Sequence, residues 1–276
     1  MLFVYLSTLY SKGQTGTFYY TTLRYMNITV SSVQGARPSM EDTYIIHTFS
    51  SSGTTLLAVF DGHGGRFVSE YAASRFLDFL KWSSQEDQDV GSAAKAIEDA
   101  LLAMDNSLRP TRTVSGSTAN IVVITATHIL CANVGDSRAC LLTGDTCVPL
   151  STDHKPDLAQ ERTRIESAGG IVLYSLGAVA RVDGVLALSR ALGDFEFKRG
   201  VNPSIQKIIA VPEITVRRRR EAADQFIIVA SDGLWDVMSN EDALNQLRER
   251  PHAAHLVQNA ISRYSNDNIT AIVLSF

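Results

Sequence analysis

Residues 55–65 read TLLAVFDGHGG. The first six residues form a short, continuous run of apolar and β-branched side chains, which is typical of a buried β-strand. An aspartate and three glycines follow within five residues, and glycine lets the backbone bend sharply and approach a ligand closely. The stretch therefore predicts a strand at Thr55–Phe60 whose end carries Asp61 to the boundary between a buried sheet and a cleft.

Other apolar strands of the chain end in the same way. The run FIIVA at 226–230 leads into Asp232, Asn133-Val134-Gly135 leads into Asp136, and Asp267 stands immediately before the last apolar run. An ionised carboxylate at such a boundary is unfavourable unless it is paired or bound to a metal. Acidic residues at several strand ends therefore indicate a site that attracts cations.

Basic residues are scarce in these segments. Arg138 follows Asp136 closely, and Arg37 precedes Glu41 and Asp42. Oxygen-rich sites with few cationic neighbours suit Mg²⁺ or Mn²⁺. Two such ions can clamp a phosphate and activate a bridging water, so a metal-dependent phosphohydrolase is the function that this pattern favours. A single Asp-Gly after a strand is more often only a turn; the repetition of the pattern in one chain is what favours the metal site.

The order of the predicted elements indicates the fold class. Apolar runs typical of strands occur in clusters, and pairs of helical patterns separate them, with apolar side chains at helical spacing around 67–79 and 93–104. Strict alternation of strand and helix is absent, which favours mostly antiparallel sheets covered by helices. The strand patterns continue to the last residue without a low-complexity linker, so one α+β domain is expected.

Composition narrows the function classes. The chain has 276 residues, 45% hydrophobic, and a net charge of -4, so neither disorder nor non-specific nucleic-acid binding is expected. The apolar N-terminal stretch of about ten residues is too short to span a bilayer. Cys131, Cys140 and Cys147 form no CxxC pair, which favours free thiols in a reducing compartment, the cytoplasm or nucleus.

Eight segments, in this order along the chain, resemble the type 2C family of metal-dependent protein serine/threonine phosphatases. They are Gln34–Asp42 (QGARPSMED), Phe60–Gly65 (FDGHGG), Ser115–Ala119 (SGSTA), Asn133–Arg138 (NVGDSR), Asp153–Pro156 (DHKP), Leu188–Asp194 (LSRALGD), Ser231–Asp236 (SDGLWD) and Asp267–Asn268. The match runs from about residue 28 to the C-terminus. Eight ordered motifs make the resemblance highly specific.

The resemblance implies a four-layer α-β-β-α sandwich, with two mostly antiparallel sheets flanked by helices. It places a single catalytic domain at 27–276, a flap segment at about 155–200, and an N-terminal extension of uncertain order at 1–26. It also implies phosphorylated protein substrates. Net charge and the short apolar stretch predict no nucleic-acid partner and no membrane span, and a monomer is expected.

The resemblance further assigns a role to each site residue. Asp61 is expected to bridge two Mg²⁺ or Mn²⁺ ions, with Asp232 and Asp267 on one ion and Glu41 and the Gly62 carbonyl on the other. Asp42 is expected to support the metal ligands from outside the metal site. Thr118, Asp136 and Asp236 are expected to form or surround a third, weaker metal position. Arg37 is expected to bind the phosphate, and His63 to donate a proton to the leaving oxygen.

These roles predict hydrolysis of phosphoserine and phosphothreonine by an activated water, without a phosphoenzyme intermediate. Two alternatives remain on the same fold: a pseudophosphatase that only binds, and a phosphomonoesterase of small molecules. Retention of Glu41, Asp61, Asp232 and Asp267 disfavours the first. The sequence does not distinguish a small-molecule phosphomonoesterase from a protein phosphatase, because substrate specificity depends on the shape of the flap and groove.

Several residues receive a structural interpretation or remain open. Asp194 is expected to have a structural role rather than to bind metal, and His154 to order a loop. Tyr264 stands where the family often has glycine, before the motif that carries Asp267. The run Arg217–Arg220 is interpreted as a solvated hairpin tip between two strands, with a docking patch for an acidic partner as the alternative.

Overall fold

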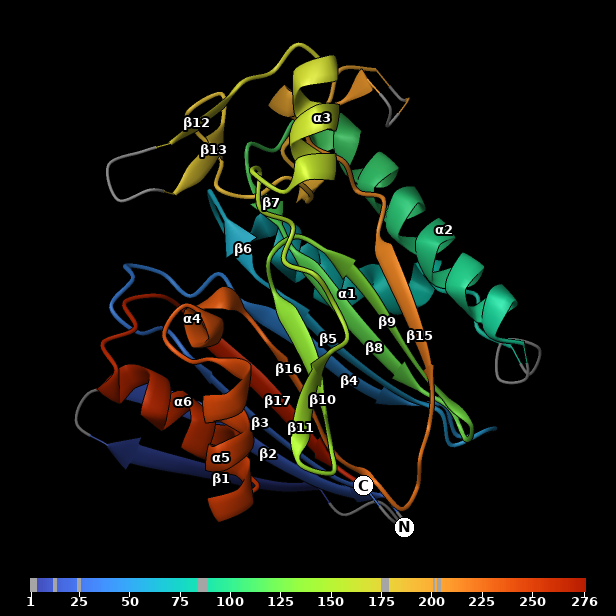
Figure 1. The fold of residues 1–276 in the computed structure, drawn as a ribbon, viewed down its shortest axis with the longest axis vertical. Helices are drawn as coiled ribbons and strands as arrows, with labels where there is room; N and C mark the ends of the chain where they lie inside the picture. The colour runs from blue at the N-terminus through green and yellow to red at the C-terminus, as the bar shows by residue number, and fades with distance from the viewer. Residues whose placement is uncertain are drawn as a thin grey trace.

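A computed structural model describes residues 4–11, 14–23, 26–83, 89–174, 179–200, 202 and 205–276. Two large antiparallel sheets dominate it (Figure 1). The seven-stranded sheet contains, in spatial order, β1 (Val4–Ser11), β2 (Gln14–Leu23), β3 (Met26–Val33), β17 (Ile269–Ser275), β16 (Asp224–Ala230), β10 (Arg138–Thr143) and β11 (Thr146–Pro149). The five-stranded sheet contains β15 (Glu213–Arg218), β9 (His128–Val134), β8 (Ala119–Ile124), β5 (Thr55–Phe60) and β4 (Thr43–Thr48).

Strand β5 shows why its sequence is apolar without a break. Leu56, Ala58 and Phe60 pack with helices α1 (Phe67–Phe79) and α2 (Val90–Leu108) in one core. Leu57 and Val59 point the other way, into the core between the two sheets. Because successive side chains of a strand point to opposite faces, a strand that is covered on both faces needs apolar residues at every position.

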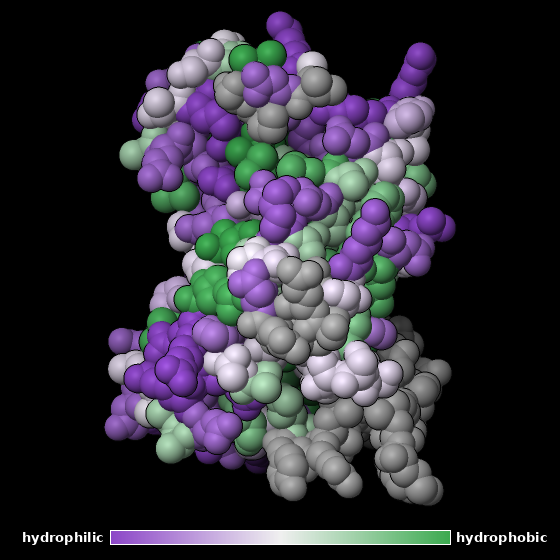
Figure 2. Space-filling model, turned by 90° about the vertical axis from the view of Figure 1, so that its right-hand side faces the viewer, coloured by the Kyte–Doolittle hydropathy of each residue, from purple (hydrophilic) through white to green (hydrophobic). Residues whose placement is uncertain are grey.

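The second sheet is covered in the same manner. Helices α4 (Asp232–Trp235), α5 (Asn240–Glu249) and α6 (Ala253–Ser262) pack against the outer face of the seven-stranded sheet through a core that includes Leu244, Leu256 and Val273. The layers are therefore helix, sheet, sheet and helix, which confirms the predicted four-layer α+β fold. The face that carries α2 is turned to the viewer in Figure 2, where hydrophilic residues lie toward both ends and hydrophobic residues gather across the middle.

A smaller unit lies above the ends of the two sheets (Figure 1). It comprises α3 (Ala159–Ser167) and the hairpin of β12 (Val172–Tyr174) and β13 (Ala180–Val182), and it has its own core around Ile165, Val182 and Leu188. A short three-stranded sheet of β14 (Leu192–Gly193), β7 (Gly116–Ser117) and β6 (Gly62–His63) joins it to the sandwich. This unit falls within the predicted flap, 155–200.

At the N-terminal edge, β2 pairs with β3 and β1 pairs with β2, so this part of the chain continues the seven-stranded sheet. The division of the chain at residue 26 stays a prediction. In the part of the chain that the structure describes, no helix is both long and apolar enough to cross a bilayer.

The interpretation of Arg217–Arg220 as a hairpin tip is wrong in one respect. Strands β15 and β16 lie in different sheets, so the run crosses from one sheet to the other. The Arg219 guanidinium donates to the Thr125 carbonyl at 3.0 Å and lies 4.9 Å from the ring centroid of Phe276. Arg219 therefore ties the turn after β8 to the end of β17, a structural role that sequence spacing does not reveal.

Tyr264 has the backbone conformation that glycine prefers. Its φ angle is +63°, and it follows α6 at the position where helices often end in a left-handed residue. The Ser265 amide donates to the Ala260 carbonyl at 3.1 Å and the Tyr264 amide to that of Ile261 at 3.0 Å, the hydrogen-bond pattern of a Schellman motif. A side chain in this conformation costs about 1 kcal/mol or more.

Replacing Tyr264 by glycine is therefore expected to raise the free energy of unfolding by about 1 kcal/mol, because glycine carries no penalty at positive φ. Urea denaturation of the two proteins under identical conditions measures the difference. Tyr264→Ala, which keeps the Cβ atom, should give no such gain. Equal or lower stability of the glycine variant would contradict the assignment of strain to this residue.

Candidate active site

Most of the predicted site residues line one cavity, of about 320 Å³, at the end of the sandwich and below the flap. They are Arg37, Glu41, Asp61, Gly62, His63, Thr118, Asp136, Asp232 and Asp267. The sheet topology brings these residues together, because β5, β9 and β16 end at the same side of the molecule, where β17 begins. Flap residues Arg181 and Leu186–Leu188 complete the wall.

Two predicted residues lie outside this cavity. Asp42 is buried behind it, where its Oδ2 accepts a hydrogen bond of 2.8 Å from the Ser231 hydroxyl. Asp236 is exposed and lines a neighbouring cavity together with Arg37 and Asp267. The site thus has an inner set of carboxylates, one buried supporting carboxylate and one outer carboxylate.

The inner carboxylates raise one another's pKa values. The pKa of Asp61 lies well above its usual value because the group is removed from water and faces the charges of Asp42, Asp232 and Asp136. The pKa of Asp232 is raised by burial and then by Asp136 and Asp236, although Lys155 opposes the shift. Groups that repel one another in this way gain stability from a bound cation.

The donor set fits hard divalent cations. Burial raises the pKa of Asp42 to about 6, and its Oδ1 is buried without a hydrogen-bond partner. Among the described residues, no three His, Cys, Asp or Glu side chains are already spaced to hold one ion together. Mg²⁺ commonly binds through one or two carboxylates and keeps several waters, so oxygen ligands that converge on a polar cavity meet its needs.

Two basic side chains hold carboxylates of the cavity. The Arg37 guanidinium lies 2.5 Å from Asp267 Oδ2, and the Lys155 ammonium lies 2.5 Å from Asp136 Oδ2 and 3.9 Å from Asp232 Oδ2. Sequence reasoning gave Lys155 no role, although its motif, DHKP, was among the eight segments. Arg138, which stands two residues from Asp136, instead pairs with Asp153 at 2.6 Å.

His63 lies against a partner from the far end of the flap. Its Nε2 is 2.7 Å from Asp194 Oδ2. Burial alone would lower the pKa of His63, but the charge and hydrogen bond of Asp194 outweigh burial and raise it. A Cβ atom on Gly116 would collide with both groups, so glycine is required there for the pair to form. The expectation of a structural role for Asp194 did not include this contact with His63.

Asn268 connects the loops that carry Glu41 and Arg37. Its amide nitrogen donates to the carbonyls of Gln34 and Ser39 at 2.7 Å and 2.9 Å, and its Oδ1 accepts from the Glu41 amide at 2.7 Å. The Glu41 carboxylate accepts from the Ser39 hydroxyl at 2.7 Å. Asn268 thereby orients a predicted metal ligand, a role that the Asp267–Asn268 motif alone did not reveal.

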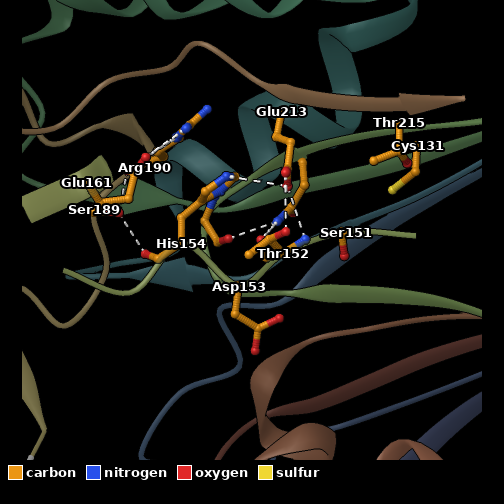
Figure 3. Close-up of polar contacts among 12 residues, drawn as sticks. Cys131, Ser151, Thr152, Asp153, His154, Glu161, Ser189, Arg190, Glu213 and Thr215 are labelled. Atoms are coloured by element: carbon orange, nitrogen blue, oxygen red, sulfur yellow. Dashed lines mark hydrogen bonds and ion pairs between the residues drawn. The ribbon is translucent and has the colours of Figure 1, made fainter. Parts of the chain in front are cut away.

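A polar network connects His154 with the flap residues Glu161, Ser189 and Arg190 (Figure 3), and His154 also contacts Gly135, the neighbour of Asp136. His154 Nδ1 accepts from the Gly135 amide at 3.2 Å, and the Ser189 amide donates to the His154 carbonyl at 2.8 Å. The Ser189 hydroxyl donates to Glu161 at 2.7 Å, and Glu161 also accepts from Arg190 at 2.7 Å. His154 therefore has the loop-ordering position that was expected of it.

This network predicts a loss of stability in acid. Burial lowers the pKa of His154 to about 3, so between pH 6.5 and 3 the unfolded chain binds a proton that the folded chain excludes. Burial opposes ionisation of Glu161, but its bond to Arg190 and the charge of Arg164 outweigh burial and lower its pKa to about 2. The contribution of Glu161 to the free energy of unfolding is present above about pH 4.5 and is lost as the pH falls toward 2.

We expect the His154 contribution to the free energy of unfolding to fall by about 2 kcal/mol between pH 6.5 and 5, at 1.36 kcal/mol per pH unit. Denaturant unfolding across this range measures it. His154→Asn should be less stable at pH 7.5 and should show a flatter pH dependence from 6.5 to 5. An unchanged slope in that variant would contradict a buried neutral imidazole.

Comparison with known proteins agrees with this geometry. The family model "Protein phosphatase 2C" matches residues 26–269. The chain is 40% identical over 259 residues to probable protein phosphatase 2C 45 of Oryza sativa subsp. japonica, covering 89% of this chain and 86% of that protein. It is 36% identical over 267 residues to protein phosphatase 1L of Bos taurus, with 91% and 72% covered.

A solved structure shares the fold. The crystal structure of serine-threonine phosphatase 2C from Toxoplasma gondii superposes with a TM-score of 0.79 at 22% identity, covering 100% of this chain and 99% of that one. The family match extends over most of the chain and includes every residue of the cavity. The chain therefore belongs to the protein phosphatase 2C family and is a protein serine/threonine phosphatase.

Proposed function

We propose that the chain hydrolyses phosphoserine and phosphothreonine side chains of proteins by attack of an activated water, without a phosphoenzyme intermediate. The observation that carries this proposal is the convergence of Asp61, Asp232 and Asp267 in one cavity that also contains Arg37 and His63. Mutually repelling carboxylates, a guanidinium and an imidazole are the groups that a two-metal hydrolysis of a phosphomonoester needs.

Asp61 faces the charges of Asp232 and Asp267 in this cavity and would contact both ions of a Mg²⁺ or Mn²⁺ pair. Glu41 and the Gly62 carbonyl would hold one ion, while Asp232 and Asp267 would hold the other. When bound, such ions offset the charge of the phosphate dianion and supply hydroxide near neutral pH. Asp42 would support this set from behind, and Thr118, Asp136 and Asp236 would border a third, weaker position.

The chain's own residues bind the phosphate and supply the proton. The Arg37 side chain is 57% exposed, so nitrogen donors beyond its contact with Asp267 are accessible to phosphate oxygens. His63 borders the same cavity and carries a raised pKa, which favours the protonated form that donates to the leaving alkoxide. Asp194 orients the imidazole and stabilises its charge through their 2.7 Å contact.

Phosphate release from phosphothreonine and phosphotyrosine peptides tests this proposal. We expect turnover of the phosphothreonine peptide in Mn²⁺ or Mg²⁺, loss of turnover in a chelator, and recovery when the metal is returned in excess. Turnover of small phosphate esters but of no phosphopeptide would favour the alternative of a small-molecule phosphomonoesterase. Binding of phosphopeptides with no turnover in either metal would favour a pseudophosphatase.

Two further proposals concern the cellular compartment and the oligomeric state of the protein. Cys131 and Cys140 are buried free thiols and Cys147 is a half-buried one, which supports a reducing compartment such as the cytoplasm or nucleus. We infer that the chain acts as a monomer on phosphorylated proteins. Light scattering on a size-exclusion column should give about the mass of one 30.1 kDa chain.

A further inference from the structure

A second cavity, of about 260 Å³, opens beside the carboxylate cavity. Arg37 and Asp267 line both cavities, so the two adjoin at the residue to which we assign the phosphate. The other lining residues are Gly233, Asp236, Val237, Tyr264, Ser265 and Asn266. A peptide whose phosphate contacts Arg37 would therefore pass this second cavity with a neighbouring residue.

Tyr264 borders this cavity with a side chain that contributes little to the folded core. The residue is 86% exposed, although its φ angle of +63° is one that glycine adopts without penalty. A large side chain in a strained conformation at the rim of a cavity indicates a use for the ring outside the core, because strained residues gather at functional sites.

The charges around the ring favour a basic ligand. Asp267 is paired with Arg37 at 2.5 Å, and Arg263, which precedes Tyr264, is paired with Asp242 at 2.8 Å. The carboxylate of Asp236 is exposed and adds a negative charge to the same cavity. An aromatic face beside a carboxylate suits a guanidinium or ammonium group, which the ring attracts through its quadrupole.

We propose that Tyr264 and this cavity form a subsite for an arginine or lysine side chain of the phosphorylated substrate. The proposal rests on the proposed function, because it uses Arg37 as the phosphate contact. An extended peptide advances about 3.3 Å per residue, so the basic residue would lie within about three positions of the phosphorylated one.

Matched phosphothreonine peptides test the subsite. One set carries a single arginine at each of the three positions on either side of the phosphothreonine, and the reference peptide carries norleucine there. For wild type, we expect kcat/KM to be about two- to fivefold higher with arginine in at least one position, the size of a partly exposed cation–π contact. The difference should appear in KM, and also in the Kd of fluorescent phosphonate analogues, which need no turnover.

Variants of Tyr264 supply the controls. Tyr264→Phe keeps the ring and should keep the preference, whereas Tyr264→Asn tolerates the same backbone conformation without a ring and should remove it. Tyr264→Gly should also remove the preference while it stabilises the fold, an outcome that misfolding cannot produce. p-Nitrophenyl phosphate has no flanking residue, so its turnover should be the same in all four proteins.

Two failures are distinguishable. Absence of metal-dependent turnover of any phosphopeptide would count against the proposed function, and the Kd comparison would still decide the subsite. Equal kcat/KM and equal Kd for arginine and norleucine peptides in wild type, or a preference that survives in Tyr264→Asn, would overturn the subsite alone.

Discussion

Asp61→Asn is expected to lower kcat/KM for a phosphothreonine peptide by about 10³-fold or more. Asp61 is the carboxylate that both ions would share, and ions that stabilise transition-state charge supply several kcal/mol at about 1.4 kcal/mol per tenfold in rate. Phosphate release under saturating Mn²⁺ measures the loss. Asp145→Asn is the matched control, because Asp145 is 95% exposed and contacts only the surface residue Arg248 among the ion pairs of the described residues.

Asp61→Asn is also expected to change thermal stability, in a direction that depends on whether metal is present. In a chelator, Asp61→Asn should melt at a higher temperature than wild type, because it removes a buried charge that Asp42, Asp232 and Asp136 repel. In Mn²⁺ the order should reverse, since wild type gains stability from ion binding. Wild-type activity in Asp61→Asn, or a lower melting temperature in the chelator, would contradict the role assigned to Asp61.

His63→Asn is expected to lower kcat for phosphothreonine peptides by about 10²–10⁴-fold, the usual contribution of a positioned general acid. Its effect on p-nitrophenyl phosphate should be small, because that leaving group needs no proton. The measurement is the ratio of the two rates in each protein. Asp194→Asn should lower the peptide rate in the same direction but less, because the imidazole remains and loses only its partner.

Two outcomes would contradict the assignment of His63. An equal loss of rate on both substrates would mean that His63 holds the site together and does not protonate the leaving group. Full peptide activity in His63→Asn would mean that another group supplies the proton.

The sequence predicted the layers of the fold because burial leaves a simple pattern. Strand β5 is apolar at every position since a helix layer covers one face and a sheet covers the other. Four carboxylates of the cavity could also be predicted, because Asp61, Asp136, Asp232 and Asp267 each stand next to a glycine or asparagine and within two residues of an apolar run. Prediction failed at Arg217–Arg220, where charge spacing could not show that β15 and β16 lie in different sheets.

Contacts between distant segments could not be predicted from spacing. The pair of His63 and Asp194 joins residues 131 positions apart, and Arg138 pairs with Asp153 although Asp136 is nearer in sequence. Lys155 contacts Asp136 because the loop after β11 runs beside the residues that follow β9. Each of these contacts depends on the path of the backbone through the sheets, which local patterns do not encode.

Metal binding measured together with catalysis tests the central claim most directly. Protein stripped by exhaustive chelation should release no phosphate from a phosphothreonine peptide, and equilibrium dialysis with Mn²⁺ should restore activity as at least two ions bind per chain. Asp61→Asn should bind fewer ions and remain inactive. Full activity of the stripped wild-type protein, or recovery of activity without bound Mn²⁺, would contradict a metal-dependent phosphatase site built on these carboxylates.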